Sequence, residues 1–271
     1  MKKPLVINLL FFLLILIIVV PMLFPFFWMF MSAFKVQVDI IRWPPTLIFQ
    51  PTLANFQRVI WDQNFLLHLE NSSIVAFSVV ILSLIIGLPA SYSIARFRQK
   101  RLLMLILVAR IMPGISFLMP WYIVFSRLRL MDSHIALILS HMLIVLPVVV
   151  WIMSAFFETI PEELEASAMV DGATRQRAFF SIALPLSMPG VVTATTLSLI
   201  FSWNNFMFSQ VLSMHRTRTL PLLVFNFIGY ASLDWGGVMA AAVGIVAPAI
   251  VFTMFFQKYV VKGLTVGAVK G

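Results

Sequence analysis

The sequence predicts an all-α integral membrane protein with six transmembrane helices and both termini on the cytoplasmic side. Of its 271 residues, 61% are hydrophobic and only 11% are charged, and the mean hydropathy is +1.02. Such a composition is typical of membrane-embedded chains and excludes a soluble domain. Each of six apolar runs reaches the roughly 20 residues that are needed to cross the hydrocarbon core. We therefore expect a single transmembrane domain over residues 1–271.

The spans can be placed in order along the chain. The first run follows Lys2 and Lys3 and is too long for a cleaved signal peptide, so it is expected to stay as the first span. A polar stretch with the doublet Pro44-Pro45 follows, and it favours an extended segment. Asn71-Ser72-Ser73 then opens the second span. The expected spans cover about 5–33, 72–95, 102–125, 135–157, 186–212 and 238–256.

The orientation follows from the basic residues. The tight turn Arg96–Arg101 carries four of them, which places it in the cytoplasm by the positive-inside rule. With that orientation, the inner segments, including the loop 158–185 and the tail 257–271, carry more Lys and Arg than the outer segments. Anchoring at the ends of the spans explains the net charge of +9 better than binding to nucleic acid does.

Several classes of site are excluded by what the sequence lacks. There is no cysteine, which excludes a disulfide framework and a thiolate metal site. His68, His134 and His141 have no metal-ligand spacing, so a structural role is expected for each. No cluster of nucleophile, base and metal ligand appears, and we expect neither a catalytic residue nor a bound cofactor.

The loop 158–185 is the polar exception in this apolar chain. Pro161 suits a first helical turn, and the acids after it favour the positive end of a helix dipole. Gly172 is expected to end this helix in a left-handed conformation. Thr174 is expected to cap a second helix, which Pro185 would close. Half of the ten carboxylates of the chain lie here: Glu158, Glu162, Glu163, Glu165 and Asp171.

Two interpretations of this loop follow from the residues alone. A helix–Gly–helix segment between spans can lie as a solvated loop on the lipid headgroups. It can equally be a docking element for a soluble partner.

Polar residues inside the expected spans are candidates for a transport pathway. A charge such as Arg110 near mid-membrane costs about 3 kcal/mol, so it should face protein or water. Arg110 either lines the pathway or bonds carbonyls that Pro113 frees in its own helix. Trp203-Asn204-Asn205 either makes helix–helix hydrogen bonds or lines a pathway for polar solutes, which is the interpretation we favour because amides and an indole suit neutral polyhydroxyl solutes.

The loop also resembles a known family. Gly172, nine residues, Ile182 and then Leu184-Pro185 are similar to the cytoplasmic signature of bacterial ABC importer permeases. The residues around Pro161 and Asp171 resemble those of the carbohydrate, maltose-type branch of the family. Trp203-Asn204-Asn205-Phe206 is similar to the Trp-Asn-x-Phe of that branch. Ala166 stands where the family has the glutamate of its Glu-Ala-Ala motif, and Glu165 lies one position early.

The resemblance implies the type I ABC importer permease fold and a role for this loop as a coupling helix. That helix would dock on a separate ABC ATPase dimer, which binds ATP and Mg. A second, related permease subunit, an extracytoplasmic solute-binding protein and a sugar or polyol solute would complete the system in the bacterial inner membrane. The loop residues that would contact the ATPase or shape the docking helix are Glu162, Glu163, Glu165, Ala168, Asp171, Gly172, Arg175, Ile182, Leu184 and Pro185.

Two further segments have alternative interpretations. The expected external segment that begins with His215 and Arg216 is an aromatic interface belt or, as in the family, a contact for the binding protein. The C-terminal residues after Lys262 form a flexible basic tail, or they correspond to the family's ending and contact the ATPase. The tail residues that the resemblance would place on the ATPase are Gly267, Lys270 and Gly271.

Other functions fit the sequence less well. No Gly-x-x-x-x-Gly-Lys-Ser/Thr motif is present, so nucleotide chemistry must come from another chain. An ion-coupled secondary carrier would be expected to place carboxylates at mid-membrane, and none of the ten lies clearly inside a span. An ABC permease for a non-sugar solute is the remaining alternative. The C-terminal residues and the Trp-Asn-x-Phe motif argue against it, because both resemble the carbohydrate branch.

Overall fold

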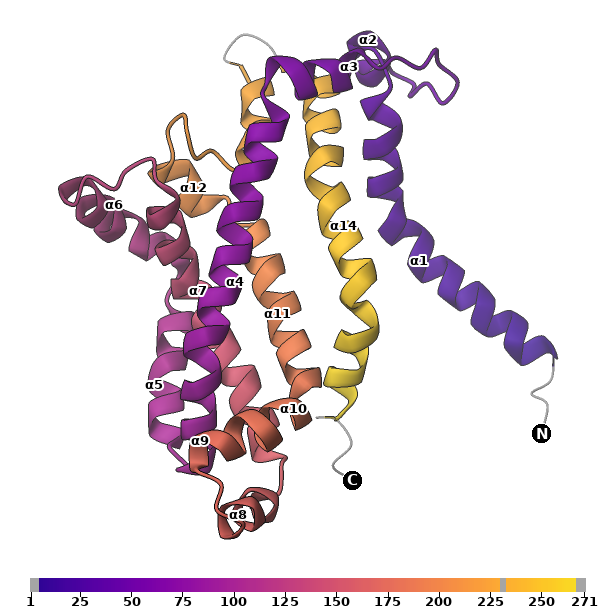
Figure 1. Cartoon of the computed structure of the whole chain (residues 1–271). Helices are drawn as coiled ribbons and strands as arrows, with labels where there is room; N and C mark the ends of the chain where they lie inside the picture. The colour runs from indigo at the N-terminus through magenta and orange to yellow at the C-terminus, as the bar shows by residue number, and fades with distance from the viewer. Residues whose placement is uncertain (1–4, 230–232, 267–271) are drawn as a thin grey trace. The chain divides into compact units, whose positions relative to one another are not determined.

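The computed structural model describes residues 5–229 and 233–266, which are almost entirely helical (Figure 1). The chain divides into two compact units: unit 1 contains Met1–Phe65 and Leu223–Ala247, and unit 2 contains Leu66–Leu222 and Pro248–Gly271. Four helices are long and apolar enough to cross a membrane. These are α1 (Leu5–Ala33), α4 (Phe65–Arg96), α7 (His134–Glu158) and α14 (Trp235–Val266).

A fifth crossing is present if one bent pair of helices counts as a single span. The pair consists of the helical segment Arg175–Leu186 and helix α11 (Met188–Trp203), which meet at an angle of 75°. The protein is therefore an all-helical membrane protein with four or five apolar helices of spanning length among its described residues.

Four of the expected spans overlap these long helices, but their bounds differ. Helix α14 continues to Val266, ten residues past the expected end near residue 256 and into the expected tail. The second was expected to begin at residue 72, yet α4 begins at Phe65. Asn71 and Ser72 lie inside the helix because their side chains are buried and hydrogen-bonded. Asn71 Nδ2 donates to the carbonyls of Arg216 and Arg218, and Ser72 Oγ accepts from the Leu220 N–H.

The other two expected spans are broken, which differs from the expectation of one helix each. The stretch 102–125 contains α5 (Lys100–Ile111), a 3₁₀ turn (Gly114–Phe117) and α6 (Leu118–Arg127). Pro113 has no N–H and pushes Met112 into an extended conformation (φ −64°, ψ 132°), which ends the helix. In the stretch 186–212, α11 ends at Trp203 and the chain resumes as α12 (Met207–Leu212).

The connecting segments consist of short helices. In unit 1 they are α2 (Gln37–Ile41), α3 (Ala54–Gln57) and a π-helical turn (Arg58–Asp62), with a 3₁₀ turn (Val224–Phe227) before α14. In unit 2 they are α8 (Glu162–Val170), α9 (Arg175–Ala178), a π-helical turn (Phe179–Ala183) and α10 (Leu184–Leu186). The helix α13 (Leu220–Leu223) lies at the boundary between the two units.

Unit 1 is held together by polar side chains near the end of α1. Lys35 is buried, and its Nζ donates to the Thr46 carbonyl at 2.6 Å. Burial lowers the pKa of Lys35, because desolvation disfavours the charged form. Asn55 Nδ2 donates to the carbonyls of Ala33 and Lys35 at 2.9 and 2.8 Å. These bonds fix the segment that follows the first apolar helix.

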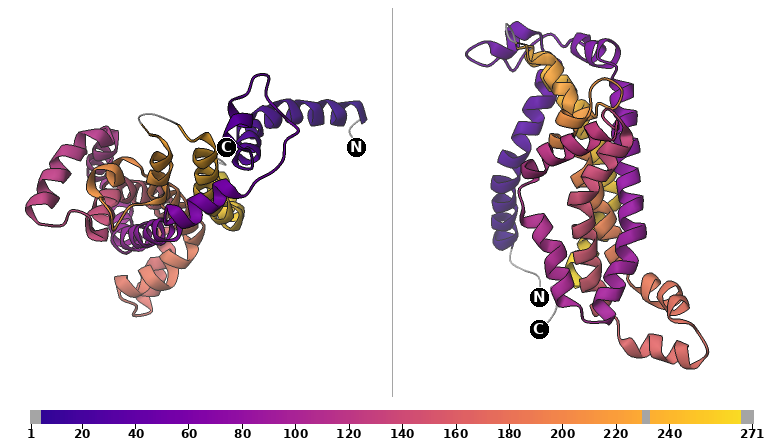
Figure 2. Two further views of the ribbon diagram at one scale, coloured as in Figure 1. Left: turned by 90° about the horizontal axis from the view of Figure 1, so that it is seen from above. Right: turned by 90° about the vertical axis from the view of Figure 1, so that its left-hand side faces the viewer.

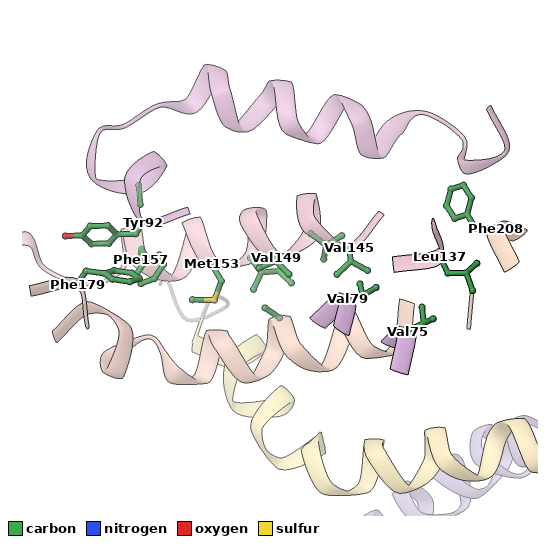
Figure 3. Packing of buried hydrophobic residues seen from close by; sticks show 14 of the residues in the cluster. Val75, Val79, Tyr92, Leu137, Val145, Val149, Met153, Phe157, Phe179 and Phe208 are labelled. Atoms are coloured by element: carbon green, nitrogen blue, oxygen red, sulfur yellow. The ribbon is translucent and has the colours of Figure 1, made fainter. Parts of the chain in front are cut away.

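Helix α7 forms the centre of unit 2. It packs against α11 and α5, and its buried face includes Val145, Val149 and Met153 (Figure 3). Close approach to α11 depends on Gly190, because a Cβ there would lie 2.5 Å from Cγ of Phe156. The tightly packed bundle provides a rigid support for the polar features at its two ends.

Candidate functional site

The loop 158–185 forms a helix–turn–helix at one end of unit 2, beyond the ends of α4 and α7 (Figures 1 and 2). Pro161 occupies the N-cap of α8, immediately before the acidic first turn. At the other end Gly172 has φ 89°. The N–H of Gly172 donates to Met169 O at 3.1 Å, and the N–H of Ala173 donates to Ala168 O at 2.9 Å. These are the two bonds of a Schellman motif, so the predicted glycine stop is confirmed.

The second helix of the loop begins as predicted but does not end at Pro185. The Thr174 hydroxyl accepts from the Arg177 N–H at 3.2 Å, which caps α9. The helical path then continues through a π-helical turn at Phe179–Ala183 and through Pro185 itself. A wider turn just before a proline accommodates the missing N–H. The chain bends instead at Ser187, where α11 begins.

Glu165 is the only buried residue of α8. Its Oε1 accepts from Nε and Nη2 of Arg96 at 2.9 and 2.5 Å, and its Oε2 accepts from the Tyr92 hydroxyl. The Arg96 and Glu165 side chains are only 7% and 5% exposed. Arg96 also donates to the Phe157 carbonyl at 2.8 Å. The ion pair therefore joins α8 to the ends of α4 and α7.

Tyr92 is itself fixed by aromatic packing. Its ring lies 5.6 Å from that of Phe157 and 4.8 Å from that of Phe179 (Figure 3). Phe179 belongs to the second helix of the loop, so both helices of the loop reach the same aromatic cluster. The carboxylate of Glu165 is held by a rigid hydroxyl on one side and a guanidinium on the other.

Elsewhere α8 stands away from the bundle. A cavity of about 590 Å³ separates its start from the basic turn and is lined by Arg98, Lys100, Glu158 and Glu162 among others. A second cavity of about 340 Å³ reaches Met169 and Arg175. The face opposite Glu165 carries Glu163 and Val170, and Val170 is 87% exposed. Helix α8 thus presents an acidic and apolar surface and is attached to the bundle by one buried ion pair and by an exposed one between Glu162 and Arg98.

The predicted loop residues therefore divide into three groups. Glu165 faces inward, which differs from the outward contact expected of it and follows from its pairing with Arg96. Exposed residues are Glu162, Glu163, Asp171, Gly172, Arg175 and Pro185. Half-buried residues are Ala168, Ile182 and Leu184.

A smaller cavity in unit 2 brings together two of the predicted pathway residues. It has a volume of about 180 Å³ and is lined by Arg110 and Asn205 together with Gly114 and six apolar residues, Met112, Phe117, Leu143, Ile144, Met207 and Phe208. The other two predicted residues lie elsewhere. Trp203 is 3% exposed and contacts Phe252, whereas Asn204 is exposed at the end of α11. The cavity lies where both broken helices are interrupted.

Comparison with known proteins identifies the family. Residues 79–266 match the family described as "Binding-protein-dependent transport system inner membrane component". The chain belongs to this family. As a permease it is a transport subunit and not an enzyme, and nucleotide hydrolysis in such systems belongs to a separate chain.

Relatives and solved structures agree with this assignment. The permease is 35% identical over 256 residues to the trehalose/maltose transport system permease protein MalG of Thermococcus litoralis, with 92% of each chain covered. It is 35% identical to the sulfoquinovosyl glycerol transport system permease protein SmoH of Agrobacterium fabrum, with 94% and 91% covered. A bacterial ABC transporter involved in alginate import has the same fold, with a TM-score of 0.71, 21% identity and 96% and 98% coverage.

The opposite end of unit 2 in the permease is organised by Asp132. Its carboxylate accepts hydrogen bonds from the backbone N–H groups of the segment 214–217 and from the Thr217 hydroxyl, at 2.9 to 3.2 Å. Partial burial acts to raise the pKa of Asp132, but these hydrogen bonds outweigh it and hold the pKa well below its usual range. Asn71 also bonds His134, so the basic segment around Arg216 is held in one conformation.

We expect Asp132→Asn to lower the free energy of unfolding at pH 7 by about 1–3 kcal/mol, because an amide nitrogen would face N–H donors. A carboxylate whose pKa is depressed in the folded state stabilises the protein above its unfolded pKa of about 3.9 and loses this contribution as the pH falls below it. Unfolding in detergent at pH 7 and pH 3 measures the effect, with exposed Glu158→Gln as control. If Asp132→Asn lowered the free energy of unfolding by the same amount at pH 7 and at pH 3, this account would be contradicted.

Sequence reasoning missed several of these functional partners. Tyr92 was not singled out, and Arg96 was counted only as part of a basic turn. A buried ion pair between Arg96 and Glu165 joins residues that are far apart in the chain, so no local spacing reveals it. The acid Asp132, which follows Arg127 and Arg129 in the expected external loop, was the available signal for an ordered loop. The tail residues Gly267, Lys270 and Gly271 lie outside the described residues.

Proposed function

We propose that the permease is a subunit of an ATP-driven, binding-protein-dependent importer for a sugar or sugar-like solute. The relatives named for trehalose/maltose, diacetylchitobiose and trehalose transport support this solute class. The permease would cross the bacterial inner membrane six times with both termini in the cytoplasm, and the broken segment α5–α6 would be the third crossing. An ABC ATPase dimer, a second related permease and an extracytoplasmic binding protein would complete the assembly.

The observation that carries this proposal is the attachment of α8. A helix that is anchored to the bundle by one buried ion pair, with cavities on both sides and an exposed outer face, is suited to engage another protein. Glu163 and Val170 on the exposed face of α8, and Asp171 at its C-cap, would contact the ATPase. Glu165 would instead transmit the movement of α8 to Arg96 and Tyr92 in α4. Closure of the ATPase dimer on ATP would then rock the spans between inward- and outward-open states.

The pathway residues have a corresponding role in this mechanism. Arg110 and Asn205 would line the route of the solute, since they share one cavity. Trp203 and Asn204 would lie beside it at the break between α11 and α12. Gly267, Lys270 and Gly271 of the tail would add a second contact with the ATPase.

Docking of α8 can be tested by site-specific crosslinking. The chain has no cysteine, so Val170→Cys would introduce a single thiol on the exposed face of α8. We expect a photoactivatable maleimide at this position to crosslink to the ATPase subunit encoded by a neighbouring gene. Met214→Cys is the matched control, because Met214 is also exposed but follows α12, which lies at the other end of unit 2 from α8 (Figure 1).

The crosslinking result has a clear alternative. Crosslinks from position 214 but not from position 170 would place the ATPase at the wrong end of the molecule. Crosslinks from position 170 to lipid alone in the assembled transporter would support the headgroup interpretation of the loop. Either result would contradict the docking assignment.

A further inference from the structure

We propose that the cavity containing Arg110 and Asn205 binds an acidic group, a carboxylate or a sulfonate, on the saccharide that this permease transports. The inference rests on the proposed transport function and adds the chemical class of the solute. It is carried by the position of the cavity and by the hydrogen-bonding groups that line it.

The cavity lies where two spans lose their helical structure. Helix α5 ends at Ile111, and α11 ends at Trp203 before α12 begins at Met207. Non-helical backbone at membrane depth is tolerated where it is buried in protein or lines a water-filled cavity. Transporters commonly place their solute sites at such breaks. The position of the cavity is therefore suited to bind a polar solute.

Arg110 brings a permanent positive charge to this place. Its guanidinium carbon lies 5.0 Å from the centre of the Phe201 ring, which orients the group. In the part of the chain that the structure describes, the ion pairs of arginine involve Arg58, Arg96 and Arg98, and no carboxylate pairs with Arg110. In the proposed third crossing, such a charge is unfavourable without a counter-charge. An anionic group of the solute would supply one.

Asn205 adds a second hydrogen-bond donor. Its Oδ1 accepts from the Phe208 N–H at 3.2 Å. Because a backbone N–H can bond only the oxygen of the amide, this contact also fixes the orientation of the side chain. One of the two lone pairs of Oδ1 is thus engaged within the protein, and the amide nitrogen is oriented as a donor for a solute.

Among the side chains of the cavity, hydrogen-bond donors outnumber acceptors. Apart from Arg110 and Asn205, the lining residues are glycine or apolar. A carboxylate or a sulfonate accepts hydrogen bonds only, and a guanidinium can bind it with two parallel bonds. A neutral sugar hydroxyl brings no charge, so it would leave the Arg110 guanidinium without a counter-charge. The lining therefore favours an acidic saccharide over a neutral one.

The test uses the complete transporter, purified with its ATPase, second permease and binding protein and reconstituted in liposomes. The probes are a glucuronate-containing disaccharide and a neutral disaccharide, maltose. We expect the binding protein to retain the acidic disaccharide more tightly and the transporter to import it in an ATP-dependent manner. Arg110→Gln and Asn205→Leu should each lower the initial rate of this import about tenfold or more, since each removes hydrogen bonds to a charged group.

Two further variants separate a binding role from a general loss of charge. Arg110→Lys keeps the charge but loses the two parallel bonds, so its import rate should fall between those of wild type and Arg110→Gln. Arg101→Gln removes an exposed charge from the basic turn and should leave the rate unchanged. Each variant is first shown to assemble with the ATPase, so that a lost subunit is not mistaken for lost binding.

The possible outcomes are distinct. Retention of maltose alone by the binding protein, or undiminished import of the acidic disaccharide by Arg110→Gln, would overturn the acidic class and leave the importer assignment intact. Import by the wild-type transporter without ATP would overturn the importer assignment itself.

Discussion

Glu165→Ala is expected to lower the free energy of unfolding of unit 2 by about 3–5 kcal/mol, because it leaves the Arg96 guanidinium buried without its carboxylate. The Arg96 side chain is only 7% exposed, so the guanidinium loses its counter-charge in a largely buried place. Tyr92 loses its acceptor in the same change. Unfolding of the purified permease in detergent, followed by denaturant titration, measures the loss.

A neighbouring acid on the same helix is the control for this prediction. Glu163 is exposed on the opposite face of α8, so Glu163→Ala should change stability by no more than about 0.5 kcal/mol. Glu165→Gln keeps an acceptor oxygen and should have an intermediate effect. Equal effects of Glu165→Ala and Glu163→Ala would show that the ion pair does not anchor α8.

Gly172→Pro is expected to reduce solute-stimulated ATP hydrolysis of the assembled transporter by about tenfold or more, which corresponds to about 1.4 kcal/mol of lost coupling. Proline fixes φ near −65°, whereas Gly172 has φ 89°. Proline also removes the N–H that donates to Met169 O at 3.1 Å. The turn between α8 and α9 must therefore rearrange. ATP hydrolysis by the reconstituted complex, with and without binding protein and solute, measures the effect.

An effect of the backbone conformation at Gly172 can be separated from a steric clash of the new side chain. A Cβ at position 172 would meet no atom within 4 Å, so a side chain by itself has room. Asparagine tolerates the left-handed conformation and alanine tolerates it less well. Solute-stimulated ATP hydrolysis should therefore be highest in the wild type and should decline through Gly172→Asn and Gly172→Ala to Gly172→Pro. A Gly172→Pro transporter that retains full stimulation would argue strongly against a coupling role for this loop.

Local features of the fold could be predicted from the sequence because their causes are local. The stop at Gly172 and the cap at Thr174 depend on atoms within a few residues. The four long apolar helices follow from length and hydropathy alone. In each case the residues that decide the structure lie within the segment that they shape.

Features that depend on distant partners could not be predicted. Glu165 was expected to face another protein, and its burial requires Arg96 and Tyr92 on a different helix. Pro113 was recognised as a helix breaker, but the sequence does not show that a second break near Asn205 lies against the first. The hydrogen bonds of Asp132 also join segments far apart in the chain. These contacts are set by the packing of unit 2 and not by spacing.

The bend at Ser187 joins α11 at an angle of 75° to the shorter helical segment Arg175–Leu186, so a rotation at the bend would move the far end of α11. The 16 residues of α11 extend about 24 Å at 1.5 Å per residue, from the bend beside the loop 158–185 to the break next to Asn205. A tilt of about 10° at the bend would displace the far end by about 4 Å. In the proposed mechanism, a push on the segment Arg175–Leu186 would therefore change the shape of the cavity that contains Asn205.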